Sequence, residues 1–170
     1  MHPAAAGVRH VWPADATQSQ PHSYMAILRN VPYGNARFTV EIDGTAQTGF
    51  AVVQLPEMIL EHEAFREGGE PALPPQILPS RPHFGTLLLK RGFRGSLDLY
   101  QWWKAASTGA ADARRLVVVR LHNEDNSAVV AQWTLKHTFP IRHGFAPLDG
   151  LDGGPLIEQV ELACPSVEME

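Results

Sequence analysis

Cysteine is almost absent from the chain, since only Cys164 occurs among 170 residues. A single cysteine excludes an intramolecular disulfide and a cysteine-rich metal site, and this usage is typical of the reducing cytosol. We expect Cys164 to be a small apolar filler at the end of a strand. The first residues lack a basic-then-apolar leader, and no apolar run approaches the roughly 20 residues that span a bilayer. The sequence therefore predicts synthesis in the cytoplasm and no membrane anchor.

A surplus of positive charge is also lacking, because the formal net charge is -4. Proteins that bind nucleic acid usually concentrate basic residues on one face, so we expect no specific nucleic-acid binding. The basic residues Lys90, Arg91 and Arg94 do cluster around Phe93. Such a cluster is typical of a solvated turn that pairs with acidic residues of a neighbouring chain.

Motifs that carry catalysis are missing as well. No Gly-x-Ser-x-Gly nucleophile elbow occurs, and the Glu-Gly-Gly-Glu segment at residues 67–70 lacks the Lys-Ser/Thr of a phosphate-binding loop. Eight histidines are present, yet none forms a His-x-x-x-His pair on a predicted helix. We therefore expect no enzyme activity and no cofactor. A metal site built from strands distant in sequence stays open as an alternative.

The chain divides near residue 35. Residues 1–34 are rich in alanine, proline, histidine, serine and glutamine and show no period, and Pro3, Pro13 and Pro21 interrupt any helix. We interpret them as an N-terminal arm, flexible or ordered on assembly. Residues 35–170 form the predicted folded domain.

The first half of that domain alternates like β-structure. Residues 37–43 have the period of a half-buried strand, Asp43-Gly44 is typical of a turn, and residues 48–54 resemble a second strand, so we expect a hairpin. Residues 58–66 form a third predicted strand. A long loop is expected over residues 67–81, because its prolines lack the N–H that a ladder needs. Residues 83–90 return to strand character.

One helix is expected, with Ser96 as its cap. Leu99, Trp102, Trp103 and Ala106 follow the helical spacing i, i+3, i+4, i+7. We expect Trp102 to anchor the helix in the core, and Trp103 to do the same or to reach a subunit interface. Residues 115–122 and 128–136 form a second predicted hairpin, 138–145 continue extended, and 156–163 close the domain. The predicted fold is mainly β, a barrel or sandwich of about eight strands with one flanking α-helix.

Two segments point to a particular protein family more specifically than the strand and helix patterns do. They are Arg-Glu-Gly-Gly-Glu at residues 66–70 and Leu-Lys-Arg-Gly at residues 89–92, followed by the tryptophan-bearing helix and by Gln-Trp-Thr-Leu-Lys at residues 132–136. In this order and spacing, residues 35–168 closely resemble the tail tube proteins of contractile-tailed phages. They are similar as well to the inner-tube proteins of extracellular contractile injection systems.

The resemblance implies a structural subunit that forms hexameric rings, stacked so that joined sheets surround a lumen. It implies as partners other copies of the chain, a sheath protein, baseplate and tube-cap proteins, and a cargo effector in the lumen. The particle would be a phage virion or an injection particle, the latter either kept by the cell or released from it. On this reading the candidate inter-subunit contacts are Arg66, Glu67, Glu70, Lys90, Arg91 and Arg94, and the candidate lumen-facing residues are Thr39, Glu41 and Asp43.

Two alternatives stay open. The arm before residue 35 is longer than a plain tube subunit needs, which suits a tube initiator or a specialised tube paralogue at the baseplate. A member of another class, a small β-sandwich that binds a ligand or a metal through its histidines, would show the same strand pattern.

Overall fold

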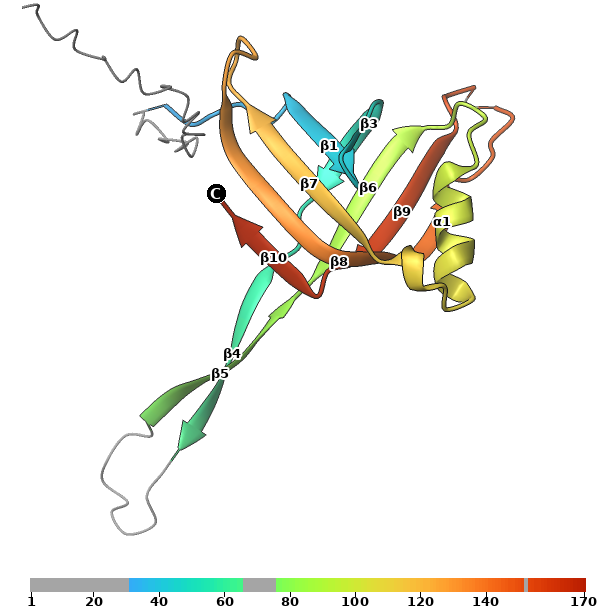
Figure 1. Cartoon of the computed structure of the whole chain (residues 1–170). Coiled ribbons are helices and arrows are strands. Elements are labelled where there is room, and N and C mark those ends of the chain that lie inside the picture. Colours follow the sequence, from blue (N-terminus) through green and yellow to red (C-terminus); the bar gives the residue numbers. More distant parts are fainter. Residues whose placement is uncertain (1–30, 66–75, 152) are drawn as a thin grey trace, which may run out of the picture.

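A computed structural model describes residues 31–65, 76–151 and 153–170 (Figure 1). Its elements are almost all strands, with one α-helix and one short 3₁₀ turn. In chain order they are β1 (Phe38–Ile42), β2 (Thr45–Gln47), β3 (Phe50–Gln54), β4 (Met58–Phe65), β5 (Gln76–Phe84), β6 (Thr86–Gly92), α1 (Asp98–Ser107), η1 (Ala111–Ala113), β7 (Arg115–His122), β8 (Val129–Phe145), β9 (Ile157–Ala163) and β10 (Ser166–Met169).

The long strand β8 joins two parts of one sheet. Its first part pairs with β7 and β10, and its second part pairs with β9. Between the two parts His137 has a φ of 57°, in the left-handed region that interrupts the extended path of a strand. We call β2-β1-β7-β8-β10 the first half-sheet and β8-β9-β6-β3 the second half-sheet. The order ends at β2 and β3, so in the described chain the strands do not close into a barrel.

The core lies between the two half-sheets. Alternate residues of the strands point inward, as the period of two predicts. They include Val40, Leu87, Leu89, Val117, Leu135, Val160 and Leu162, all at most 1% exposed. This arrangement confirms the predicted fold class, mainly β with one flanking helix.

Helix α1 covers this core with one face. Leu99 and Trp102 are buried, and the Trp102 indole Nε1–H donates a 2.7 Å hydrogen bond to the carbonyl of Ala113. Trp102 is therefore the core anchor that the sequence predicts. Trp103 is half-buried and stacks on Tyr100 with ring centroids 6.3 Å apart. Its role at a subunit interface stays a prediction.

The predicted helix cap is wrong. The N-cap residue is Leu97, and its side chain makes no capping hydrogen bond. Ser96 lies one residue earlier, where its hydroxyl donates to the Asp98 carboxylate at 2.6 Å and accepts a long 3.4 Å bond from the Asp98 N–H. Asp98 in the first turn supplies the negative charge that favours a helix N-terminus.

The first predicted hairpin is also wrong. After the turn at Asp43-Gly44, β1 pairs with the three residues of β2, and its other edge pairs with β7. The strand at residues 50–54 leaves this ladder and pairs with β6 instead. Gly49 lies between them with a φ of 91°, a conformation that lets the chain change direction. The second predicted hairpin, β7 with β8, is confirmed as an antiparallel pair.

The predicted loop over residues 67–81 is wrong in its second half. Residues 76–84 form β5, which pairs antiparallel with β4 in a two-stranded ribbon. Pro79 and Pro82 lie inside β5, which the proline rule had excluded. Each strand of a two-stranded ribbon has an open edge, where a missing N–H removes no ladder bond. The register also shifts between Leu60 and His62. Residues 67–75 of the predicted loop lie outside the described residues.

Candidate assembly surfaces

The outer face of the first half-sheet carries the predicted lumen residues Thr39 and Glu41. Both point away from the core, because they alternate with the buried residues of β1. The Glu41 carboxylate pairs with the guanidinium of Arg120, whose Nε donates to Gln132 Oε1 at 2.7 Å. Thr39 Oγ1 lies 3.0 Å from His122 Nε2. Polar side chains on the three neighbouring strands β1, β7 and β8 are therefore linked by hydrogen bonds and an ion pair across this face.

The same face continues onto β10. Lys136 Nζ contacts both carboxylate oxygens of Glu168, at 2.7 and 2.8 Å. The third predicted residue, Asp43, lies beyond the end of β1 with a φ of 49°. Its carboxylate accepts a 3.0 Å bond from the Leu116 N–H and lies 3.5 Å from Arg115. Asp43 thus fixes a turn, and the lumen assignment of all three residues stays a prediction.

Two strand edges of the second half-sheet have no strand partner among the described residues, although α1 packs against β8. Strand β3 pairs with β6 alone, and residues 139–145 of β8 pair with β9 alone, in the part of the chain that the structure describes. Such edges present backbone N–H and C=O groups that another strand can bind. On β3, the side chain of Val52 is 46% exposed. A second copy of the chain is one source of the missing strand.

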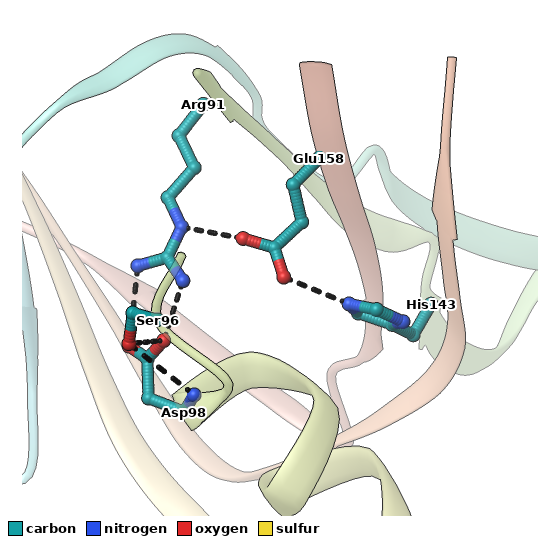
Figure 2. Close-up of polar contacts among 5 residues, drawn as sticks. All are labelled: Arg91, Ser96, Asp98, His143 and Glu158. Atoms are coloured by element: carbon teal, nitrogen blue, oxygen red, sulfur yellow. Dashed lines mark hydrogen bonds and ion pairs between the residues drawn. The ribbon is translucent and has the colours of Figure 1, made fainter. Parts of the chain in front are cut away.

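Figure 2 shows where the predicted contact residue Arg91 lies. Its side chain is only 11% exposed, and its guanidinium binds the Glu158 carboxylate at 2.8 Å and the Asp98 carboxylate at 2.5 and 3.1 Å. Arg91 is therefore occupied within its own subunit. Lys90 points from the other face of β6, and Arg94 is exposed just after the strand. Their roles as inter-subunit contacts stay predictions.

The cluster around Arg91 ties four elements together. Glu158 of β9 is 1% exposed and also lies 2.9 Å from His143 Nε2 of β8 (Figure 2). The Arg91 hydrogen bond is the main cause that lowers the pKa of Asp98 to about 2, against burial, which raises it. Burial lowers the pKa of Arg91, but its bonds and charge contacts with Asp98 and Glu158 outweigh burial and raise it overall.

Sequence reasoning missed Glu158 and His143. A signal for Glu158 exists, because it shares the inward face of its strand with Val160 and Leu162. An acid in that pattern needs a buried partner. The sequence alone does not identify the partner, since Arg91 lies 67 residues away.

The remaining sequence predictions are placed as follows. Arg66, Glu67 and Glu70 lie outside the described residues, so their contact role stays a prediction. Cys164 is buried as expected, and burial raises the pKa of its thiol to about 11. Among the described residues, histidine, cysteine and acidic side chains form no group of three that suits a metal ion. The described helices include none with the length and apolarity to span a bilayer.

The β4–β5 ribbon extends away from the body of the protein (Figure 1). It exposes large apolar side chains over most of its length, which in an isolated domain would favour aggregation. Their exposed fractions run from 39% to 68%: Met58, Ile59, Leu60, Phe65, Ile77 and Leu78. This ribbon is therefore an exposed apolar surface that projects from the body of the protein.

Comparison with known proteins finds a matching family and several solved structures of the same fold. The family described as T4-like virus tail tube protein gp19 matches residues 34–168. No curated protein sequence matches. A chain of the anti-feeding prophage baseplate, 6-fold symmetrised, is 26% identical with a TM-score of 0.68, over 84% of this chain and 97% of that one.

Two further solved structures share the fold. A chain of the extracellular contractile injection system PVC, in its sheath-tube complex in the extended state, has 18% identity and a TM-score of 0.73, covering 89% and 99% of the two chains. A chain of the anti-feeding prophage tube-terminating cap has 17% identity and a TM-score of 0.71, with the same coverage. Since the family match spans most of the sequence, the chain belongs to the T4-like virus tail tube protein gp19 family.

Proposed function

We propose that this tail tube protein assembles into hexameric rings that stack around a continuous lumen. The observation that carries the proposal is the family match over residues 34–168, nearly the whole described domain. The open edges of β3 and of the second part of β8 support it, because lateral neighbours that pair there would continue the sheet around a ring. The baseplate chain of similar sequence comes from a particle described as 6-fold symmetrised.

The ring is tested by its mass. Purified full-length chain, measured by native mass spectrometry over a range of concentrations, is expected to show a species of six subunits. A ladder of two, three and four subunits without a preferred six would contradict ring closure. A chain that stays monomeric at the highest concentration would contradict self-assembly altogether.

We further propose a sheath protein, baseplate and cap proteins, and a cargo effector as partners of the tube. The similar chains come from a sheath-tube complex, a baseplate and a cap, which supports the first three. The particle is a phage tail or an extracellular injection machine, and the role in it is structural rather than enzymatic. Pull-down of a co-expressed sheath protein by assembled tubes, but not by dissociated subunits, is the expected result.

The polar outer face of the first half-sheet is the proposed lumen wall. Thr39 and Glu41 lie on it, and its charged groups are paired within the subunit, which suits a hydrated channel. A Thr39→Cys variant tests this in assembled rods. A small maleimide is expected to label it, whereas a maleimide on a bulky polymer is not. Gln159→Cys, on the outer face of the second half-sheet, is the matched control, and the opposite labelling pattern would move the lumen to that face.

A tube initiator at the baseplate is the second candidate function. The 26% identical chain from a baseplate favours it. A main tube protein is expected to form long rods alone, whereas an initiator would stop at one or a few rings until another tube protein is added. Electron microscopy of the chain with and without such a protein separates the two.

A further inference from the structure

Arg94 lies in a turn after β6 whose backbone is held on both sides. One residue earlier, the Phe93 N–H donates a 2.8 Å hydrogen bond to the carbonyl of Leu156, and the Phe93 ring meets the Phe145 ring edge-on with centroids 5.2 Å apart. One residue later, Gly95 has a φ of 85°, a conformation that glycine adopts without strain. The position from which the Arg94 side chain projects is therefore well defined.

The tip of the Arg94 side chain lies against the backbone of Gly49. A Cβ atom at Gly49 would lie 3.1 Å from Nη2 and 3.2 Å from Cζ of Arg94, both shorter than an ordinary van der Waals contact. The guanidinium thus occupies the space that a side chain at Gly49 would need. Because Gly49 directly precedes Phe50, the first residue of β3, the guanidinium lies beside the start of a strand that has an open edge.

The guanidinium of Arg94 has no counter-charge within the part of its own subunit that the structure describes. No hydrogen bond or ion pair joins it to residues 31–65, 76–151 or 153–170. Arg91 and Arg120 differ in this respect, because each binds an acid of its own chain. Arg94 is also exposed, so its N–H donors are accessible to a group from outside the subunit.

A carboxylate is the ligand that suits this guanidinium best. The planar fork of an arginine matches the two oxygens of a carboxylate, and a side chain that is already held in place loses less conformational freedom on binding. The chain has more acids than bases, with a formal net charge of -4. Glu57 and Asp112 are exposed acids without an ion pair among the described residues. A second copy of the chain can therefore supply a carboxylate.

We propose that the Arg94 guanidinium binds a carboxylate of a second copy of the chain beside the open edge of β3. A neighbour whose strand adds to this edge brings its side chains to the start of β3, where the guanidinium rests on Gly49. The ion pair adds a charge-dependent contact to the backbone hydrogen bonds between the subunits, and in this respect it rests on the proposed function. Because it lies near the surface, salt weakens it.

Arg94→Ala and Arg37→Ala are the matched test. Both positions are exposed, and neither side chain has an ion pair among the described residues, so each variant removes one free positive charge. At low ionic strength Arg94→Ala is expected to raise the protein concentration needed for six-subunit rings at least about fivefold, whereas Arg37→Ala changes it less than about twofold. High salt should remove most of the difference between Arg94→Ala and the wild type. Arg94→Lys, which keeps the charge, should retain most of the assembly.

A cross-link identifies the partner group. Arg94→Lys places an amine at the contact, and a carbodiimide joins an amine to an adjacent carboxylate by an amide bond without a spacer. Rings of this variant are expected to give covalent dimers whose cross-linked peptide contains residue 94, whereas Arg37→Lys should give no such peptide containing residue 37. Unchanged circular dichroism of each variant shows that the subunit remains folded.

Three results would overturn the proposed ion pair. They are equal shifts in assembly from Arg94→Ala and Arg37→Ala, a shift from Arg94→Ala that is the same at low and high salt, and a residue-94 cross-link that is absent or forms equally in dilute monomers. Absence of rings from the wild type would overturn the proposed function instead.

Discussion

At the scale of single residues, the cluster of Arg91, Asp98 and Glu158 shows how charge is used inside the subunit. The sequence suggests Arg91 as a contact to another chain. In the structure its guanidinium instead donates hydrogen bonds to Glu158 and Asp98 of its own chain. Removing one side chain of a buried ion pair leaves the charge of the other side chain buried without a counter-charge. Changes at Arg91 are therefore expected to act first on subunit stability and only through it on assembly.

The lowered pKa of Asp98 in this cluster predicts that the stability of the folded protein depends on pH. The folded pKa of Asp98 is lowered to about 2 from an ordinary value near 3.8. Stability from its ionised form is therefore full above about pH 4 and is lost as the pH falls towards 2. Thermal unfolding of the wild type should weaken more steeply over this range than that of Asp98→Asn. Because the Asp98 side chain is 44% exposed, we expect the difference at pH 7 to be at most about 1 kcal/mol.

Glu63→Gln on the ribbon is the control for removing one negative charge. It should leave the acid limb of the unfolding curve as in the wild type. Parallel pH curves of the wild type and Asp98→Asn would show that the Arg91 pair does not stabilise the folded state.

Cys164 gives a second prediction at this scale. Burial raises its pKa to about 11, and the thiolate is the reactive form, so few molecules carry it at pH 8. A thiol reagent should modify native Cys164 at least tenfold more slowly than the same residue in urea-unfolded chain. Equal rates would mean that the C-terminal strands open readily.

At the scale of elements, α1 depends on one tryptophan. Trp102 is 1% exposed, and its indole is the donor to the buried carbonyl of Ala113. Trp102→Phe keeps most of the apolar volume but leaves that carbonyl without its donor. We expect a loss of about 1–3 kcal/mol in the free energy of unfolding, measured by urea titration.

Two further variants calibrate this loss. Trp102→Ala, which also leaves a cavity, should cost about 3–5 kcal/mol. Trp103→Phe, at a half-buried position on the same helix, should cost clearly less than Trp102→Phe. A larger cost at Trp103 would reverse the assignment of the anchor.

The helix and the strands also differ in how well the sequence pattern predicts them. The helix and the β7–β8 hairpin were predictable, because apolar spacing of 3.6 and 2 residues is local information. The strand predicted over residues 58–66 is observed as β4, but its partner β5 was not predicted, since Pro79 and Pro82 indicate a loop unless the strand is known to have an open edge. The pairing of β3 with β6 depends on the chain direction at Gly49, and β10 at residues 166–169 was too short to recognise. Of the candidate contacts, Lys90 and Arg94 were found near the surface. The alternation of β9 marks Glu158 as an inward acid, but its partner Arg91 can be identified only once β9 is known to lie beside β6.

At the scale of the whole molecule, the subunit has surfaces that a single copy leaves unsatisfied. Among the described residues, two strand edges of the second half-sheet have no strand partner, and the β4–β5 ribbon exposes large apolar side chains. Lateral contacts through edges and axial contacts through ends are the two kinds of repeat that a tube needs. A self-sufficient domain would cover such surfaces within its own chain.

Cryo-electron microscopy of purified full-length protein at high concentration tests this account most directly. It predicts hollow assemblies of uniform width, with six subunits in each ring and β3 of one subunit next to a strand of its neighbour. Particles that remain single subunits, or that associate without a ring and a channel, would contradict it.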